Sequence, residues 1–138
     1  MKFETDPARL SRRLVAIGCL CAGLGVAFGA FGAHMLKGLL DPSMLAAYDT
    51  GTRYQMFHSF GMILCGLAVR ISRDPRMALA GWFFLTGIVL FSGSLYGMAI
   101  LGLRWLGPIT PVGGLTFILG WGLFAWRIWR EDPNRLAG

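Results

Sequence analysis

The sequence contains little charge: Asp, Glu, Lys and Arg together make up 14% of its 138 residues, whereas apolar residues make up 55%. This balance lies outside the range of ordinary water-soluble domains. Carboxylates are especially few, and every Asp and Glu lies outside the long apolar stretches. A proton-coupled transporter usually places a carboxylate near the bilayer centre, so this distribution argues against that class.

The motifs of common catalytic and binding sites are also missing. The sequence has no Gly-x-Ser-x-Gly, no paired carboxylates and no phosphate-cradling glycine loop. Its three cysteines, Cys19, Cys21 and Cys65, lie within apolar stretches and fit neither a secreted disulfide framework nor a zinc spacing. We therefore expect no enzymatic activity and no cofactor, and we expect the thiols to be buried without a chemical role.

Four apolar stretches fill most of the chain, and about 20 apolar residues are needed for a helix to cross about 30 Å of hydrocarbon. These stretches predict membrane-spanning helices at approximately 14–36, 54–69, 77–103 and 106–128. The first is longer than the core of a cleaved signal peptide, so we expect it to be retained. The predicted fold is all-α: an integral membrane four-helix bundle that forms a single domain over residues 1–138.

The formal net charge is +6, but the basic residues form short clusters between apolar stretches instead of covering one face. This pattern predicts membrane topology and does not favour a nucleic-acid partner. Of the 13 Lys and Arg residues, only Lys37, Arg53 and Arg104 lie in the connections that follow the first and third spans. The positive-inside rule then predicts cytoplasmic N- and C-termini, in the inner (plasma) membrane.

The connection between the first two spans contains a helix start. Asp41 is suited to cap free backbone N–H groups, and Pro42 is suited to the first helical turn. Three apolar or aromatic positions then share one side: Met44, Leu45 and Tyr48. This pattern predicts a short interfacial helix at the outer surface. Gly51 is expected to end or bend that helix before the second span.

Small residues line two faces of the first span. One face contains Gly18, Ala22, Gly25, Gly29 and Gly32, and the other contains Gly23, Ala27 and Ala30. Because small side chains let helix backbones approach closely in lipid, two such faces predict two close neighbours and a central position for this helix. The third span repeats the pattern with Gly93 and Gly97. Its polar residues are predicted to donate hydrogen bonds to other helices: Ser92, Ser94 and Tyr96.

The sequence has two histidines, and both are predicted near the outer ends of the first two spans. Because these spans run in opposite directions, His34 and His58 are expected at a similar depth. Two facing imidazoles can ligate haem or a metal ion. In the alternative, each ring hydrogen-bonds a neighbouring carbonyl or hydroxyl group. Two histidines without a third ligand favour this alternative.

Other polar residues are expected beside the histidines in one outer-end polar cluster. Its predicted members are His34, Asp49, Arg53, Tyr54, Gln55 and His58, with Tyr48 next to them. Asp49 and Arg53 form an i, i+4 ion pair if the helix continues through Gly51. Such a cluster can bind a lipid headgroup or a partner, or it can cap the bundle; we favour the structural role.

Several sequence motifs occur in an order that is typical of one family. They are GAFGAH at 29–34, RYQMFH at 53–58, SGSLYG at 92–97, LGPITPVGG at 106–114 and GW at 120–121. Together they resemble the bacterial domain-of-unknown-function 423 family, which is similar to the vertebrate transmembrane protein 256. The resemblance extends over about residues 14–126 and implies a small four-helix membrane protein with no established activity, cofactor or substrate. Gly51 departs from the family pattern, which often has alanine there.

Three hypotheses for function follow. The first is an accessory or assembly subunit of a larger membrane complex, in contact with membrane lipid and with other membrane protein subunits, its oligomeric state left open. The alternative is a small transporter or channel, because the outer end is polar and the interior is rich in glycine. The third is haem or metal binding by His34 and His58.

Overall fold

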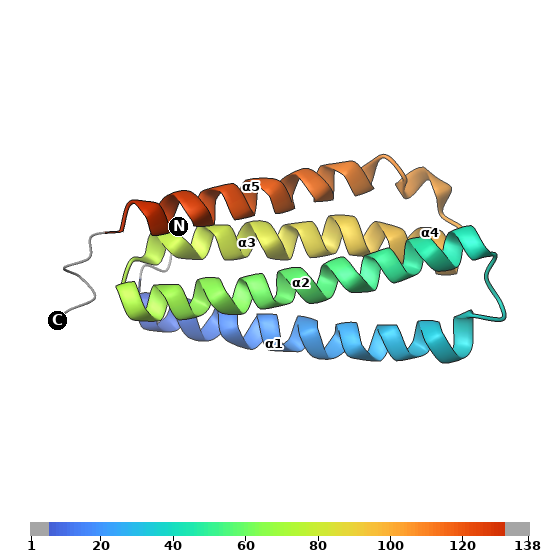
Figure 1. Ribbon diagram of the computed structural model, residues 1–138, viewed down its shortest axis with the longest axis horizontal. Helices are drawn as coiled ribbons and strands as arrows, with labels where there is room; N and C mark the ends of the chain where they lie inside the picture. The colour runs from blue at the N-terminus through green and yellow to red at the C-terminus, as the bar shows by residue number, and fades with distance from the viewer. Residues whose placement is uncertain (1–5, 132–138) are drawn as a thin grey trace.

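The computed structural model describes residues 6–131, and that part of the chain is all-helical, with no strand (Figure 1). In chain order the elements are α1 (Pro7–Phe31), the π-helical turn η1 (Gly32–Leu36), α2 (Pro42–Ser72), the 3-10 turn η2 (Pro75–Met77), α3 (Ala78–Gly87), the π-helical turn η3 (Ile88–Ser92), α4 (Gly93–Leu101), the 3-10 turn η4 (Arg104–Leu106) and α5 (Ile109–Trp129). The all-α class is therefore confirmed.

Three helical segments of the described chain are long and apolar enough to cross a membrane. They are Pro7–Leu36, Pro75–Leu101 and Arg104–Trp129. The fourth long helix, α2, has 31 residues but carries charged side chains along its length, among them Asp49 and Arg53. Length and composition thus identify three apolar helices, with α2 packed among them.

Asp-Pro pairs begin three of the helical segments, at positions 6–7, 41–42 and 74–75. In each pair the aspartate side chain accepts hydrogen bonds from backbone N–H groups of the first turn, and proline occupies the first helical position, where no N–H group is needed. At Asp41 the acceptor Oδ1 lies 2.9 Å from the nitrogen of Ser43 and 3.1 Å from that of Met44. The helix start predicted at Asp41 is therefore confirmed.

The separate short helix predicted after Asp41 is instead the first part of α2, which continues without interruption through Gly51. Gly51 is a packing position and not a helix end. A Cβ atom there would lie 2.9 Å from the ring of Tyr96, and the Gly51 carbonyl accepts a hydrogen bond from Ser92 Oγ at 2.7 Å. The prediction that Gly51 ends the helix is wrong because close approach of α4, and not a chain turn, requires the glycine.

The centre of the bundle is α2 and not α1, contrary to the prediction. Figure 1 shows α1 and α5 on opposite sides of the bundle, with α2 and α3 between them. One small-residue face of α1 packs on α2, as Gly18 contacts Ile63 and Gly32 contacts Tyr48. At Gly23, on the second face, a Cβ atom would meet nothing within 4 Å, and the same holds at Gly29 on the first face. The second face is therefore open at Gly23, and the first is covered only in part, which agrees with the position of α1 at an edge.

Among the other glycines predicted to pack, Gly25 and Gly97 do so and Gly93 does not. A Cβ atom at Gly25 would lie 3.5 Å from Met56, and one at Gly97 would collide with Leu106. Gly93 has open space around it. The prediction that Gly93 packs against another helix is wrong, because GxxxG spacing places Gly93 and Gly97 on one face without determining which of them meets a neighbour.

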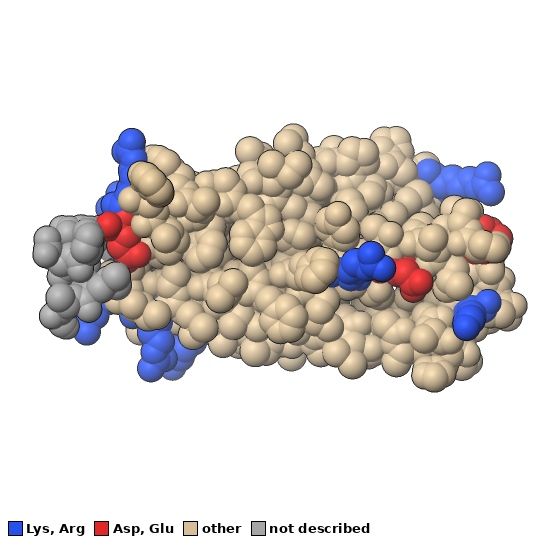
Figure 2. Space-filling model, viewed as in Figure 1, with Lys and Arg blue, Asp and Glu red and all other residues tan. Residues whose placement is uncertain are grey.

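The largest buried apolar cluster lies between α1, α2, α3 and α5. Its fully buried members are Leu14, Met62, Cys65, Val69, Ala80 and Phe84. The outward surface is also apolar, and large exposed side chains occur on every long helix. Figure 2 shows most charged residues of the visible face toward its two ends, with a broad band of other residues between them that one blue and one red group interrupt. A surface of this kind is suited to lipid.

Candidate functional site

Gln55 is the centre of a buried hydrogen-bond network that joins three helices. Its Nε2 atom donates to the backbone carbonyl of Cys21 on α1 at 2.8 Å, and its Oε1 atom accepts from the hydroxyl of Tyr96 on α4 at 2.8 Å. The side chain is buried. Gln55 therefore holds α1 and α4 to α2 and does not belong to an outward-facing cluster as predicted.

Further hydrogen bonds extend this network toward the end of the bundle at which α2 begins. The hydroxyl of Tyr48 donates to the Phe28 carbonyl at 2.7 Å, and its ring lies 5.0 Å from the ring of Tyr96. Ser94 Oγ lies 2.7 Å from Thr110 Oγ1 on α5. With the bond from Ser92 to Gly51, these contacts confirm that the three polar residues of the third span bond to other helices. Each hydroxyl has a partner, as burial requires.

His58 is buried, with 5% of its surface exposed, and it is held in one orientation. Its Nδ1 atom lies 2.7 Å from the backbone carbonyl of Tyr54, one turn earlier. The imidazole lies nearly parallel to the ring of Phe117, at an angle of 10° and a centroid distance of 3.4 Å. The alternative prediction, that this ring bonds a neighbouring backbone carbonyl, is therefore confirmed for His58.

His34 is exposed in η1 and lies far from His58, so the prediction of similar depth is wrong. The bonds from Tyr48 to Phe28 and from Gln55 to Cys21 set the register of α1 against α2. On that register His34 is level with the start of α2, and His58 lies about 24 Å further along, at ~1.5 Å per residue. The error arose because α2 begins at Pro42 and not at Tyr54. Within residues 6–131 no group of three potential metal ligands occurs.

Asp49 and Arg53 are exposed on α2 beside the open face of α1. They border a groove of about 530 Å³ together with Gly25, Val26, Gly29, Ala30, Thr52 and Met56. The helix continues through Gly51, yet no ion pair joins Asp49 to Arg53, so this predicted pair is not formed. Figure 2 shows a red and a blue group set into the apolar band, away from the ends of the molecule.

Tyr54 lies on another side of α2, where aromatic residues form a second groove. Its ring lies 4.8 Å from that of Phe91 and is 40% exposed. The groove, of about 920 Å³, is open on one side and is also lined by Phe57, His58, Phe60, Pro111, Gly114, Leu115, Phe117, Ile118 and Trp121. The predicted single polar cluster is thus divided among a buried network, a charged groove and an aromatic groove.

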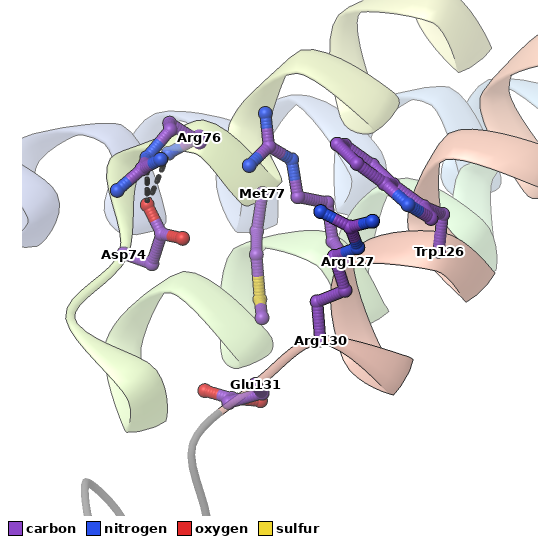
Figure 3. A pocket seen from close by; sticks show the side chains of 7 residues that line it. All are labelled: Asp74, Arg76, Met77, Trp126, Arg127, Arg130 and Glu131. Carbon is purple, nitrogen blue, oxygen red and sulfur yellow. Dashed lines mark hydrogen bonds and ion pairs between the residues drawn. The ribbon is translucent and has the colours of Figure 1, made fainter.

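The opposite end of the bundle contains a smaller, positively charged pocket (Figure 3). It has a volume of about 300 Å³ and is lined by Asp74, Arg76, Met77, Trp126, Arg127, Arg130 and Glu131. Arg76 forms an ion pair with Asp74 at 3.2 Å, and the guanidinium groups of Arg127 and Arg130 lie 4.7 and 5.0 Å from the ring of Trp126. Tryptophan and arginine together are typical of a membrane–water interface.

These observations define a class: a small, all-helical membrane protein whose apolar helices are joined by buried hydrogen bonds. The family model "Protein of unknown function (DUF423)" matches residues 28–114. A UPF0382 membrane protein of Staphylococcus haemolyticus is 42% identical over 107 residues, covering 78% of this chain and 87% of that protein. The UPF0382 membrane protein YwdK of Bacillus subtilis is 42% identical over 108 residues, covering 78% and 88%.

The chain therefore belongs to the DUF423 family of membrane proteins. A UPF0382 membrane protein of Haemophilus influenzae is also similar, with 43% identity over 97 residues, 70% of this chain and 77% of that one. No solved structure matches the chain.

Proposed function

We propose that all four long helices, α2 included, span the inner (plasma) membrane, with both termini on the cytoplasmic side. At about 46 Å, α2 is longer than the ~30 Å of hydrocarbon, and its neighbours α1, α3 and α5 are apolar. The basic side chains of 9–13, 70–76 and 127–130 lie at one end of these helices, which favours that end as cytoplasmic. Lys2 and Arg135, which were counted for the same prediction, lie outside the described residues.

We propose further that the protein is a non-catalytic accessory subunit that binds another membrane protein through the groove between α1 and α2. The supporting observation is that Asp49 and Arg53, which have no ion-pair partner among residues 6–131, lie beside the open backbone of Gly29. If a ~30 Å core is centred on α2, the Cα atom of Arg53 lies about 9 Å inside its outer edge. Charged groups at such a depth are costly without a partner.

The occupant that fits this groove is a transmembrane helix of another subunit. Gly29 and Ala30 allow a second backbone to approach closely, and the polar groups beside them require counterparts. A helix with a carboxylate for Arg53 and a hydrogen-bond donor for Asp49 satisfies both requirements. The buried network around Gln55 keeps α1 and α2 in a fixed relation, so the groove is already formed before the partner binds.

The test is native gel electrophoresis in mild detergent, with mass spectrometry of co-purifying proteins. We expect a discrete larger species, which Gly29→Leu should dissociate because leucine would fill the groove without meeting an internal neighbour. Gly122→Leu is the matched control, since Gly122 is also open but lies on α5. Recovery of the unmodified protein as a free monomer, or equal dissociation by both variants, would contradict the proposal. Ion flux by that monomer in liposomes would instead favour the transporter alternative.

A further inference from the structure

The aromatic groove between α2, η3 and α5 contains one imidazole, that of His58, among side chains that are otherwise mostly apolar. Aromatic rings surround it on several sides: Phe117 stacks on it, and Phe84 and Trp121 lie 5.5 and 6.1 Å from it, centroid to centroid. The groove is open on one side, and its volume of about 920 Å³ is toward the upper end of the usual range for small-molecule sites. Most of its lining is apolar, so an occupant of the groove must be apolar too.

The hydrogen bond of His58 determines what its other nitrogen can do. A backbone carbonyl only accepts hydrogen bonds, so the contact with Tyr54 requires a proton on Nδ1. In the neutral ring Nε2 is then an acceptor with a free lone pair. His58 is 95% buried as a residue, and its Nε2 atom has no hydrogen-bond partner among residues 6–131. Nε2 is not among the fully enclosed unpaired atoms of the described chain, so it is accessible from the groove that His58 lines and is open to a ligand that donates a hydrogen bond.

The depth of His58 restricts the chemistry of that ligand further. Because α2 runs from Pro42 to Ser72, His58 lies close to its middle. If α2 spans the bilayer, as proposed above, the ring lies near the bilayer centre. Phospholipid headgroups, and alcohols that anchor at the interface, do not place their polar groups at that depth. A neutral aromatic ring with a hydroxyl group can reach the bilayer centre at a smaller cost than a charged headgroup, and it can stack on aromatic side chains.

We propose that this groove binds a membrane-soluble hydroquinone, whose hydroxyl group donates a hydrogen bond to Nε2 of His58 and whose ring packs against Tyr54, Phe91 and Trp121. The site is separate from the groove between α1 and α2, so it is an additional function and does not depend on the partner proposed there. The oxidised quinone has carbonyl groups in place of hydroxyls. It presents acceptors to an acceptor, and the site therefore discriminates between the two redox forms.

The experiment measures binding of decylubiquinol and of oxidised decylubiquinone to the purified full-length protein in phospholipid nanodiscs, under anaerobic conditions at neutral pH. Isothermal titration calorimetry supplies the affinities. We expect the reduced form to bind about tenfold more tightly, the order of one buried hydrogen bond to a neutral group. His58→Phe should preserve ring stacking and remove this preference. Gly114→Leu should weaken binding of both forms by filling the groove, whereas Gly122→Leu should change neither.

Several outcomes would overturn the proposal. One is equal affinity of the unmodified protein for the two redox forms, which needs no variant to be folded. Another is absence of binding at bilayer concentrations of the probe, which would mean that phospholipid chains fill the groove. A third is retention of the redox preference in a folded His58→Phe protein. Competition by dodecanol, which has a hydroxyl group and no ring, should be weak; full displacement by it would contradict the stacking part of the proposal.

Discussion

Gln55 accepts a hydrogen bond from the hydroxyl of Tyr96 at 2.8 Å, across the boundary between α2 and α4. Since the same amide donates to the Cys21 carbonyl, both ends of one side chain are satisfied by different helices. Buried amides are stabilising only when both ends are paired, because an unpaired end retains the cost of its desolvation.

Tyr96→Phe is therefore expected to lower the free energy of unfolding by about 1 kcal/mol, because Gln55 Oε1 loses its donor while it stays buried. Thermal or denaturant unfolding in detergent measures the change. Tyr54→Phe is the control, since the Tyr54 hydroxyl makes no hydrogen bond within the described chain and its ring is 40% exposed. Equal losses from the two substitutions would mean that the Gln55–Tyr96 bond contributes nothing specific.

Gly113→Ala is expected to destabilise the fold more than any substitution at an open glycine. A Cβ atom at Gly113 would collide with the backbone of Phe91, which cannot rotate away as a side chain can. We expect a loss of about 2 kcal/mol, the usual order for overpacking of a close contact. Gly29→Ala should be neutral or slightly stabilising, since it meets nothing and improves helix propensity. The reverse order of stabilities in detergent would refute the packing assigned to these two positions.

Arg73→Gly is expected to stabilise the protein. Arg73 ends α2 with φ of 55°, in the left-handed region that costs a residue with a side chain about 1–2 kcal/mol. Glycine avoids this cost but loses more entropy on folding, so we expect a net gain of about 0.5 kcal/mol. Arg73→Ala removes the same charge and keeps the strain. If alanine and glycine give the same unfolding midpoint, the effect arises from charge and not from the backbone.

The start of α2 should depend on pH. Hydrogen bonds from the Ser43 hydroxyl, and then from backbone N–H groups, lower the pKa of Asp41, which lies outside the spans. A carboxyl group with a lowered folded-state pKa stabilises the fold above the ordinary aspartate pKa. This contribution is lost as the pH falls through the lowered pKa.

Hydrogen exchange at the amides of Ser43 and Met44 tests this expectation. After correction for the intrinsic rate, protection should be constant near neutral pH and should decrease only in strongly acidic solution. Asp41→Asn keeps a cap that does not titrate, and it should remove the pH dependence. A decrease in protection that is the same in both proteins would show that another group is responsible.

Local signals in the sequence predicted the helix start at Asp41, the apolar helices and the polar residues that bond between helices. These features depend on a few neighbouring residues: a capping carboxylate beside proline, and runs of apolar side chains long enough for a bilayer. The hydroxyl groups of Ser92 and Tyr96 were also predictable, because a polar group inside an apolar helix needs a partner there.

Which face of a helix is covered was not predictable. Gly25 and Gly29 are both on α1 and both small, yet one contacts Met56 and the other is open. Lipid chains and apolar side chains are similar environments for a face of small residues, so composition does not show whether the face meets lipid or another helix. The continuity of α2 was missed for a related reason: Gly51 is a plausible helix end in isolation, and only the approach of Tyr96 explains it. The distance between His34 and His58 was misjudged as a consequence.

The π-helical turn η3 divides the helix from Pro75 to Leu101 into two parts with different orientations. A π turn holds one residue more than an α turn, and one residue corresponds to about 100° of rotation. Before the turn, Phe84 faces the apolar core; at its last residue, Ser92 bonds the Gly51 carbonyl, and after it Tyr96 bonds Gln55. Deletion of a single residue in Ile88–Ser92 would turn one of these two halves toward lipid. The length of this segment, and not only its composition, is therefore expected to be fixed wherever the same fold occurs.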